Sequence, residues 1–417
     1  MASKHLIWLL GVILVGISCA ETPSPAPCVG SACDPDPAPP LGPESGLHFI
    51  EGPYGRHASV AIADDGAMFI VAHDHERKAL VVGMGSTFDE LIWIDVDGTE
   101  PERDVGYDTT AVLGTDGALH ILYRDLTESE LRHARLEEGG SVSITSIGPI
   151  GQDGTRPDMA IAADGAIHIC HHLASTGALR HVARSVEGTW SQTDVPPAPI
   201  PGCEIDESCD ELRTRGTHCA IRVRPDGPVI AYYDDSLQAL ALAAKVAGQW
   251  IGKLVDGVHP ETGINNINVG RWPALQIDAF GNLSIAYHDA TSGALRFAAS
   301  AQGQIKVQVI DSGQSVDPST GATVNAIVGV ESRLVTTADG RPLIYSRDAT
   351  HATVQRAERI GEIWTLSTLD LSHPAGFSLS AAWRADVASA AVFESWEPFI
   401  DAEGDIAWKR RLVAWID

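Results

Sequence analysis

The sequence predicts an all-β fold built from seven copies of a four-stranded antiparallel unit. Gly accounts for 40 of the 417 residues and Pro for 24, which favours short elements joined by tight turns. Pairs of glycines recur with one fixed separation, and the segments between them alternate in hydropathy. With 44% hydrophobic and 20% charged residues, the composition excludes collagen, coiled coils, polytopic membrane proteins and mostly disordered chains.

The repeated unit begins and turns at glycine. In six copies the second Gly lies 11 positions after the first, and a seventh, less regular copy starts at Gly376. The pairs are Gly55/Gly66, Gly106/Gly117, Gly154/Gly165, Gly216/Gly227, Gly270/Gly281 and Gly329/Gly340. Asp usually precedes the second Gly, and Asp-Gly favours a hairpin turn because Gly adopts a positive φ without strain.

Each copy contains four predicted strands. The first lies between the two glycines, where Val60 and Ile62 show the alternation. The second follows the turn, as in Ile167–His172, and the third carries a Leu-x-x-Ala pattern such as Leu295 to Ala298. A turn such as Gly188-Thr189-Trp190 leads to the fourth. Seven such copies predict a seven-bladed β-propeller.

The two ends of the repeat region predict how the ring closes. Asp405–Asp417 contains no turn, so it offers only the third strand of blade seven. Leu47–Glu51 precedes the first Gly and supplies the missing fourth strand, so an N-terminal strand closes the ring. Residues 47–417 are therefore predicted to be one propeller domain, with an insertion at residues 196–215.

Residues 1–19 are predicted to be a lipoprotein signal peptide. An apolar stretch follows Lys4, and the sequence that ends at Cys19 resembles a bacterial lipobox, which makes Cys19 the predicted lipidation site. Gly16 stands where Leu is usual, and the alternative is an ordinary signal peptide cleaved nearby. The Pro-rich residues 20–46 predict an extended tether. We therefore expect an exported protein, lipid-anchored in the bacterial cell envelope at the outer membrane.

The cysteines suit an oxidising compartment. Cys28 and Cys33 form one close pair, and Cys203 and Cys209 form another within the insertion. Cys170 and Cys219 remain, and the sequence leaves their pairing open. No Cys-x-x-Cys motif occurs, which argues against a zinc ribbon or thioredoxin-type redox chemistry.

The succession Gly, Asp-Gly, Tyr-x-Asp, Leu-x-x-Ala, Gly-x-Trp resembles the sialidase-like propeller repeats of bacterial secreted lipoproteins. The resemblance implies the architecture and not an activity. Sialidases carry Ser-x-Asp-x-Gly-x-x-Trp boxes, whereas Ser185–Trp190 here is shorter and lacks the Asp. A looser resemblance to propeller-type polysaccharide lyases rests on Gly55-Arg56-His57 and His73-Asp74-His75.

In a propeller, the inner strands begin and the second strands end at the same face. Ligands usually bind at that face. Two positions after the first glycines stand His57, Asp108, Arg156, His218, Trp272, Glu331 and Ser378. Seven positions after the turn glycines stand His73, Arg124, His172, Asp234, His288, Arg347 and Ser395. Because Arg pairs bidentately with acidic groups, this ring suits an anion; the alternative is a set of solvated blade ends paired with Asp.

The ring therefore yields candidate residues for an anionic glycan. The ligand-binding candidates are Arg56, Arg124, Arg156, Arg271, Trp272 and Arg347. The Asp residues that recur at second-strand ends, Asp74, Asp125, Asp235, Asp289 and Asp348, are instead expected to cap turn amides. The preferred function is a ligand-binding or interaction module for an anionic glycan or surface partner.

The alternative function is an enzyme on anionic glycans. A lyase would use His57, His218 or Tyr107 as base beside Arg156 or Arg271, whereas a sialidase-like hydrolase would use the acid pair Asp108 and Glu331. A uronate and sialate glycan screen would distinguish binding alone from either reaction.

No resident cofactor is expected. His57, His73 and His75 are weak candidates for a transition metal, and the Asp loops for Ca²⁺. The net charge of −26 argues against a nucleic-acid partner. The expected partners are a glycan or a surface protein, with the membrane reached only through the lipid anchor, and the protein is expected to be a monomer.

Overall fold

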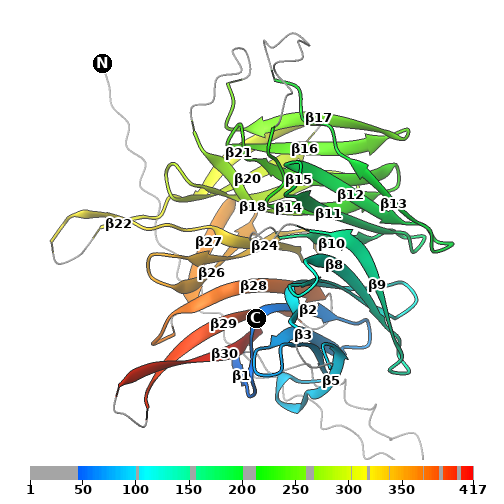
Figure 1. Ribbon diagram of the computed structural model, residues 1–417. Helices are drawn as coiled ribbons and strands as arrows, with labels where there is room; N and C mark the ends of the chain where they lie inside the picture. Colours follow the sequence, from blue (N-terminus) through cyan, green and yellow to red (C-terminus); the bar gives the residue numbers. More distant parts are fainter. Residues whose placement is uncertain are drawn as a thin grey trace, which may run out of the picture. The chain divides into compact units, whose positions relative to one another are not determined.

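The computed structural model describes residues 46–416 except for 100–102, 151–155, 201–212, 260–266, 302, 317–319, 338, 370, 385–387 and 402–404. Seven four-stranded antiparallel sheets make up the described part and confirm the predicted seven-bladed β-propeller (Figure 1). The predicted signal peptide and all but the last residue of the tether lie outside the described residues. Residues Gly42–Asp417 group as one compact unit.

Each of the first four blades runs from an inner to an outer strand in chain order. These blades are β2 (Tyr54–Ile62), β3 (Met68–Asp74), β4 (Ala79–Gly85) and β5 (Ile92–Asp97); β6 (Val105–Leu113), β7 (Leu119–Asp125), β8 (Glu130–Leu136) and β9 (Val142–Pro149); β10 (Asp158–Ile161), β11 (Ile167–Leu173), β12 (Ala178–Arg184) and β13 (Trp190–Asp194); and β14 (Cys219–Arg224), β15 (Gly227–Asp234), β16 (Ala239–Val246) and β17 (Gln249–Asp256).

The remaining blades follow the same order, except that blade seven takes its outer strand from the N-terminal side. They are β18 (Val269–Ile277), β19 (Leu283–Asp289), β20 (Ala294–Ala301) and β21 (Gln304–Asp311); β24 (Val330–Thr336), β25 (Pro342–Asp348), β26 (Thr353–Ile360) and β27 (Ile363–Leu369); and β28 (Ala375–Arg384), β29 (Ala388–Ile400), β30 (Ile406–Ile416) and β1 (Gly46–Ile50). A hairpin of β22 (Gln314–Val316) and β23 (Thr323–Asn325) joins blades five and six, and a 3₁₀ turn, η1 (Phe88–Glu90), precedes β5.

The predicted ring closure is confirmed. Strand β1 pairs antiparallel with β30, from Gly46 opposite Ile416 to Ile50 opposite Leu412. This pairing covers the edge that β30 would otherwise expose, because no turn inside the C-terminal segment supplies another strand. The strand begins one residue before the predicted start and ends one residue before the predicted end.

The hydrophobic core lies between neighbouring blades. Between blades one and two, Val71 and Leu80 of the first blade pack with Ile121 and Tyr123 of the second. The repeated glycines serve this packing. Gly270 has a φ of +101°, and a Cβ added to it would lie 2.7 Å from the Cα of Leu240 in the preceding blade. The first Gly of the repeat is therefore a close-approach residue as well as a turn residue.

The inner strands begin in two different ways. In blades one, two, five, six and seven, the residue two positions after the first Gly has a left-handed backbone; these residues are His57, Asp108, Trp272, Glu331 and Ser378. The strand registers shift at the same places, so each blade has a β-bulge there. Blades three and four lack this left-handed residue.

Blades three and four are joined instead by a disulfide and a backbone bridge, together called the pinned seam. A disulfide connects Cys170 of β11 with Cys219 of β14, with 6.4 Å between the Cα atoms, and it resolves the pairing that the sequence left open. Arg156 and His218 form a parallel bridge beside it. Val195, directly before the insertion, and Ala198 within it pack in the core between these blades. The predicted pairs Cys28/Cys33 and Cys203/Cys209 lie outside the described residues.

None of the helical segments in the described part of the chain has the length and apolar character needed to cross a bilayer.

Candidate functional site

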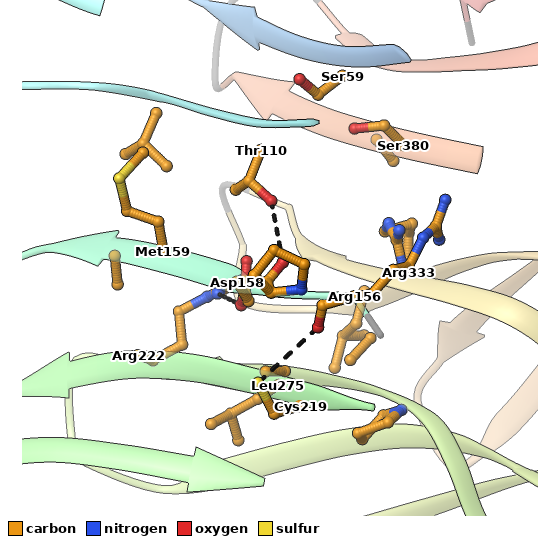
Figure 2. A pocket seen from close by; sticks show the side chains of 18 of the residues that line it. Ser59, Thr110, Arg156, Asp158, Met159, Cys219, Arg222, Leu275, Arg333 and Ser380 are labelled. Atoms are coloured by element: carbon orange, nitrogen blue, oxygen red, sulfur yellow. Dashed lines mark hydrogen bonds and ion pairs between the residues drawn. The ribbon is translucent and has the colours of Figure 1, made fainter. Parts of the chain in front are cut away.

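Residues along the seven inner strands, together with Arg156, Pro157 and His218 just before two of them, surround a cavity of about 360 Å³, here called the axial cavity. All seven blades contribute to its wall. Its polar and charged lining residues are Ser59, Asp108, Thr109, Thr110, Arg156, Asp158, His218, Arg222, Trp272, Gln276, Arg333 and Ser380. The end of the cavity at which the inner strands begin is called the mouth. Figure 2 shows polar side chains from several blades converging on the cavity.

Two of the three cavity arginines are paired with carboxylates. Arg156 of blade three reaches Glu331 of blade six, with 3.1 Å between Nη2 and Oε2. Arg222 donates to Asp158 at 3.0 Å (Figure 2). The same carboxylate oxygen accepts the backbone N–H of Ile221. These pairs neutralise part of the positive charge that the sequence assigned to the mouth. The Nη1 atom of Arg156 is buried without a hydrogen-bond partner.

Arg333 is the third cavity arginine, and its surroundings differ. Its Nη1 donates to the backbone oxygen of Ser332 at 2.8 Å, and no carboxylate in the described part of the chain forms an ion pair with it. Burial and the charge of Arg156 lower the pKa of Arg333 to about 9, although Glu331 and Asp158 oppose this effect. The cavity therefore holds a cation whose charge is poorly compensated.

His218 and Trp272 form the neighbouring wall. Burial, together with the charges of Arg156, Arg271 and Arg333, lowers the pKa of His218 to about 3, so the imidazole is neutral at pH 7. Its Nδ1 has no hydrogen-bond partner. The ring lies 5.0 Å from that of Trp272, centroid to centroid. Arg271 stands over the ring of Tyr233 at 5.5 Å, outside the cavity lining.

A second cluster of titratable groups lies between blades one and two. Asp108 accepts from Arg124 at 2.8 Å and lies 3.1 Å from Nδ1 of His57. Burial raises the pKa of Asp108, but His57, Arg124 and the charge of Arg156 outweigh it and hold this pKa at about 2. An ionised Asp108 does not favour the general-acid role that the predicted Asp108–Glu331 hydrolase pair would require.

Tyr107 lies between two histidines in this cluster. Its ring centroid is 4.7 Å from that of His57 and 4.4 Å from that of His73. The Tyr107 hydroxyl donates to Asp104, which also contacts Nε2 of His73 at 3.2 Å. Burial lowers the pKa of His73 to about 4 against the pull of Asp104, and burial raises the pKa of Tyr107. Two imidazoles, of which that of His73 is neutral at pH 7, and a phenol therefore gather beside the mouth.

A third cluster crosses from blade six to blade seven. The guanidinium of Arg347 stacks on Phe377 at 3.9 Å, Phe377 stacks on Trp396 at 5.0 Å, and Arg410 stands over Trp396 at 5.7 Å. These four side chains are called the rim ladder. Arg347 also donates to the backbone oxygen of Ala375 at 3.2 Å. The sequence pointed to Arg347 but not to its three partners.

The structure divides the predicted ligand-binding residues among these clusters. Arg156 and Trp272 line the axial cavity, Arg124 holds Asp108, and Arg347 belongs to the rim ladder. Arg56 lies near Tyr107, where its charge opposes the rise in the phenol's pKa that burial causes. Among the catalytic candidates, His57 and Tyr107 come together, whereas His218 lies with Trp272 and Glu331 with Arg156.

Two positions of the predicted ring shift by one residue. In blade four Tyr233 lies at the mouth, hydrogen-bonded through its backbone to His218, and Asp234 is the turn-capping residue, with its carboxylate accepting the N–H of Leu237. Asp235, which was expected to cap, instead accepts from the Thr217 hydroxyl at 2.6 Å. The cause is a shorter hairpin in which Arg224 pairs directly with Gly227.

Blade seven shows the same kind of shift. Glu394 pairs with Phe377 at the mouth, and Ser395 takes the place of the capping Asp. The other predicted caps are present in the structure. Asp74, Asp125, Asp289 and Asp348 each accept backbone N–H groups two or three residues ahead.

The predicted metal ligands do not assemble into a ligand set. His57 contacts Asp108, His73 contacts Asp104, and His75 is exposed. Across the described ranges no group of three or more His, Cys, Asp or Glu side chains has a metal-binding arrangement.

Sequence reasoning missed Asp158 and Arg222 as cavity residues. They stand four and six positions after the first Gly of their copies, on the inner strands that follow Arg156 and His218. The offset could have identified them, since alternate residues of a strand share one side. Trp396 and Arg410 had no such signal, because they lie on an extension found in blade seven.

No family model and no curated protein matches the chain. Among solved structures, the polysaccharide lyase Uly1 is similar at 10% identity, 87% coverage of this chain, 90% of the other and a TM-score of 0.47. The α-L-arabinofuranosidase Arb93A from Fusarium graminearum is similar at 13% identity, 73% and 91% coverage and a TM-score of 0.44. YCF48 from Cyanidioschyzon merolae is similar at 10% identity, 89% and 99% coverage and a TM-score of 0.48. All three TM-scores lie below 0.5, so these likenesses say nothing about what this chain binds or does.

Proposed function

We propose that the protein binds acidic glycans and holds the anionic group of a uronate or sialate in the axial cavity. The observation that carries the proposal is the poorly compensated charge of Arg333. A bound carboxylate would pair with its guanidinium and offset the repulsion from Arg156, which the cavity's own carboxylates offset only in part.

The rest of the wall suits the same ligand. The buried Nη1 of Arg156 and Nδ1 of neutral His218 both lack hydrogen-bond partners that sugar oxygens could supply. Trp272 offers an aromatic surface at the wall. A volume of about 360 Å³ is at the small end of ligand sites, which suits a single sugar residue more than a longer segment.

Isothermal titration with glucuronate, galacturonate and sialate, with glucose as a neutral control, tests the proposal. Arg333→Gln should weaken binding of the acidic sugar about tenfold to a hundredfold, the loss expected for one charge-assisted contact. Arg333→Lys should recover little, because an ammonium lacks the guanidinium fork. Arg341→Gln is the matched control, since Arg341 lies in the same blade at the hairpin between the two inner strands and pairs with Asp339 and Glu358. Equal effects of the two Gln variants would contradict the proposal.

The cluster around Tyr107 favours a second candidate function, a lyase acting on polyuronates. In β-elimination a base removes the C5 proton, the electron pair forms the C4–C5 double bond, the C4–O bond breaks, and the leaving oxygen takes up a proton. Tyr107 and His57 lie close enough to share these proton transfers, Asp108 orients His57, and Arg56 is the nearby cation for the carboxylate.

Ultraviolet absorbance of the unsaturated product distinguishes this reaction from binding alone. If the protein is a lyase, polyuronate should yield that product, and Tyr107→Phe should abolish the yield. Tyr233→Phe is the matched control, because this tyrosine also lies at the mouth but donates to Asn268. Binding without product would leave the binding function and reject the lyase.

We further propose that Cys19 is lipidated and anchors the exported protein to the bacterial outer membrane. The support is the lipobox-like sequence and the Pro-rich tether, both in the sequence before the propeller. Fatty-acid labelling in the cell and fractionation of the envelope should show a membrane-bound protein that Cys19→Ser releases. Unchanged membrane association of Cys19→Ser would reject the anchor.

A further inference from the structure

The hairpin of β29 and β30 extends beyond the mouth. At the mouth Ser395 pairs with Ala375 on one side and with Arg411 on the other. The pairing then continues five residues further along β29, to Ile400 opposite Ile406. The second strands of blades one, two, four, five and six instead end at the capping Asp, and that of blade three ends at Leu173. Figure 1 shows this hairpin and the one that contains β22 projecting toward the left of the view. Blade seven therefore has a wall at the mouth that the other blades lack.

The extension begins with one residue from each strand, and these two residues lie opposite each other across the hairpin. Trp396 pairs with Arg410, and both belong to the rim ladder. Stacking on Trp396, with Phe377 and Arg347 behind it, holds the Arg410 side chain in place. Lys409 and Arg411, the neighbours of Arg410 in β30, instead contact Glu51, which directly follows the outer strand β1. Successive side chains of β30 therefore separate into an inner and an outer set.

Two arginines and the carboxylate of Glu394 gather at the inner base of this wall. Arg410 lies 3.5 Å from Glu394, which also accepts from Nε1 of Trp396 at 2.6 Å. The charges of Arg56 and Arg410 both oppose the rise in the pKa of Glu394 that burial causes. The same two charges oppose the rise in the pKa of Tyr107. One buried carboxylate thus faces two partly exposed guanidinium groups, outside the axial cavity and apart from Arg333.

We propose, on the basis of the proposed function, that Arg56 and Arg410 bind a second anionic sugar of the same chain. The ligand class is then an oligosaccharide or polysaccharide with repeated acidic residues, and not a glycan that carries one terminal acid. One acidic residue occupies the axial cavity at Arg333, and the next one or the one after it contacts the rim. Simultaneous contacts raise the affinity for the longer chain, because the second contact is intramolecular.

Titration calorimetry with a monouronate and with the corresponding tetrauronate tests this inference. The tetrauronate should bind wild-type protein about tenfold or more tightly than the monouronate. Arg410→Gln should reduce tetrauronate affinity about three- to tenfold and leave monouronate affinity unchanged. Lys409→Gln removes the same charge from the adjacent, outward-facing position of β30 and should alter neither affinity.

Arg56→Gln provides a second variant in case Arg410→Gln disturbs the hairpin, and it should likewise reduce tetrauronate affinity. Equal affinity for the two ligands, or equal effects of Arg410→Gln and Lys409→Gln, would overturn the second subsite while leaving the cavity site intact. Failure of the monouronate to bind, or indifference to Arg333→Gln, would instead reject the proposed function itself.

Discussion

The ring is secured at two places by different means. At blade seven, five residues of β1 pair with β30, so the two ends of the propeller are joined by backbone hydrogen bonds and apolar packing. Between blades three and four, a disulfide and a parallel bridge join the inner strand of one blade to the blade before it. Five blades begin with a left-handed bulge, and the two at the pinned seam do not.

This difference shows how a repeat can be modified to build a site. A bulge turns the mouth residue by a local backbone distortion, whereas the pinned seam holds Arg156 and His218 by covalent and tertiary contacts. Both of these residues line the axial cavity. Among the described lining residues of the cavity, the non-repeating seam therefore contributes the two that have a buried polar atom without a hydrogen-bond partner, and the repeating blades contribute most of the framework.

Deletion of Gly46–Ile50 should break the first seam and produce the largest effect. The loss should be on the order of 5 kcal/mol or more, because buried Ile50 is removed and the edge of β30 is exposed. Thermal and urea unfolding measure it. Deletion of residues 36–40 in the predicted tether is a size-matched control that should leave stability unchanged, and equal stability of both deletions would disprove strand closure.

Replacement of Cys170 and Cys219 by Ala should break the second seam. A cross-link between residues 49 positions apart contributes roughly 4 kcal/mol by restricting the unfolded chain, so urea unfolding should show a loss of that order. The cavity should also bind acidic sugars more weakly, since Cys219 follows His218 directly. Unaltered affinity in the folded double variant would mean that the seam does not position the cavity residues.

The pinned seam should also lose stability in acid. His181, opposite Cys170 in the sheet, packs on Trp250 at 5.1 Å, and burial lowers its pKa to about 3. Because the unfolded chain takes up a proton below about pH 6.5, stability is complete above that pH and falls by about 1.4 kcal/mol per pH unit as the pH drops toward 3. His181→Phe should reduce this slope in urea unfolding at pH 7, 6 and 5.

Blade five offers the reciprocal variant. Phe297 packs on Trp364 at 5.0 Å in the same T-shaped arrangement as His181 on Trp250. Phe297→His should therefore add acid sensitivity to a blade outside the pinned seam. An unchanged slope in both variants would show that the buried imidazole is not the cause.

The smallest expected effect on stability comes from glycine substitutions that compare a bulged inner strand with one that has no bulge. Ser378→Gly should stabilise the protein by about 0.5–1 kcal/mol, because it relieves a side chain at a φ of +55°. Ala220→Gly, in the inner strand of blade four, should destabilise it by a similar amount. Chemical unfolding of both variants measures the difference, and destabilisation by both would mean that the bulge carries no strain.

Sequence reasoning was most successful where local rules apply. The glycine pairs indicated the turns and the close approaches between blades, and the turnless C-terminal segment indicated the missing strand. It was less successful at Asp235 and Ser395, where a shorter hairpin or an altered blade shifted the register by one residue. It named Arg156 and Glu331 separately, yet their contact joins blades three and six across the axis.

By itself, the sequence determined the all-β class, the seven blades, the strand that closes the ring and the gathering of His and Arg at one face. These features depend on alternation of hydropathy, on the residues that form turns and on a recurring glycine spacing, all of which can be read from the linear sequence. Only the tertiary structure decided which arginines are neutralised, which histidines flank Tyr107 and which aromatic rings hold Arg410. Those outcomes depend on distances between blades and on side-chain directions set by bulges, and residues far apart in the chain meet only when the ring is closed.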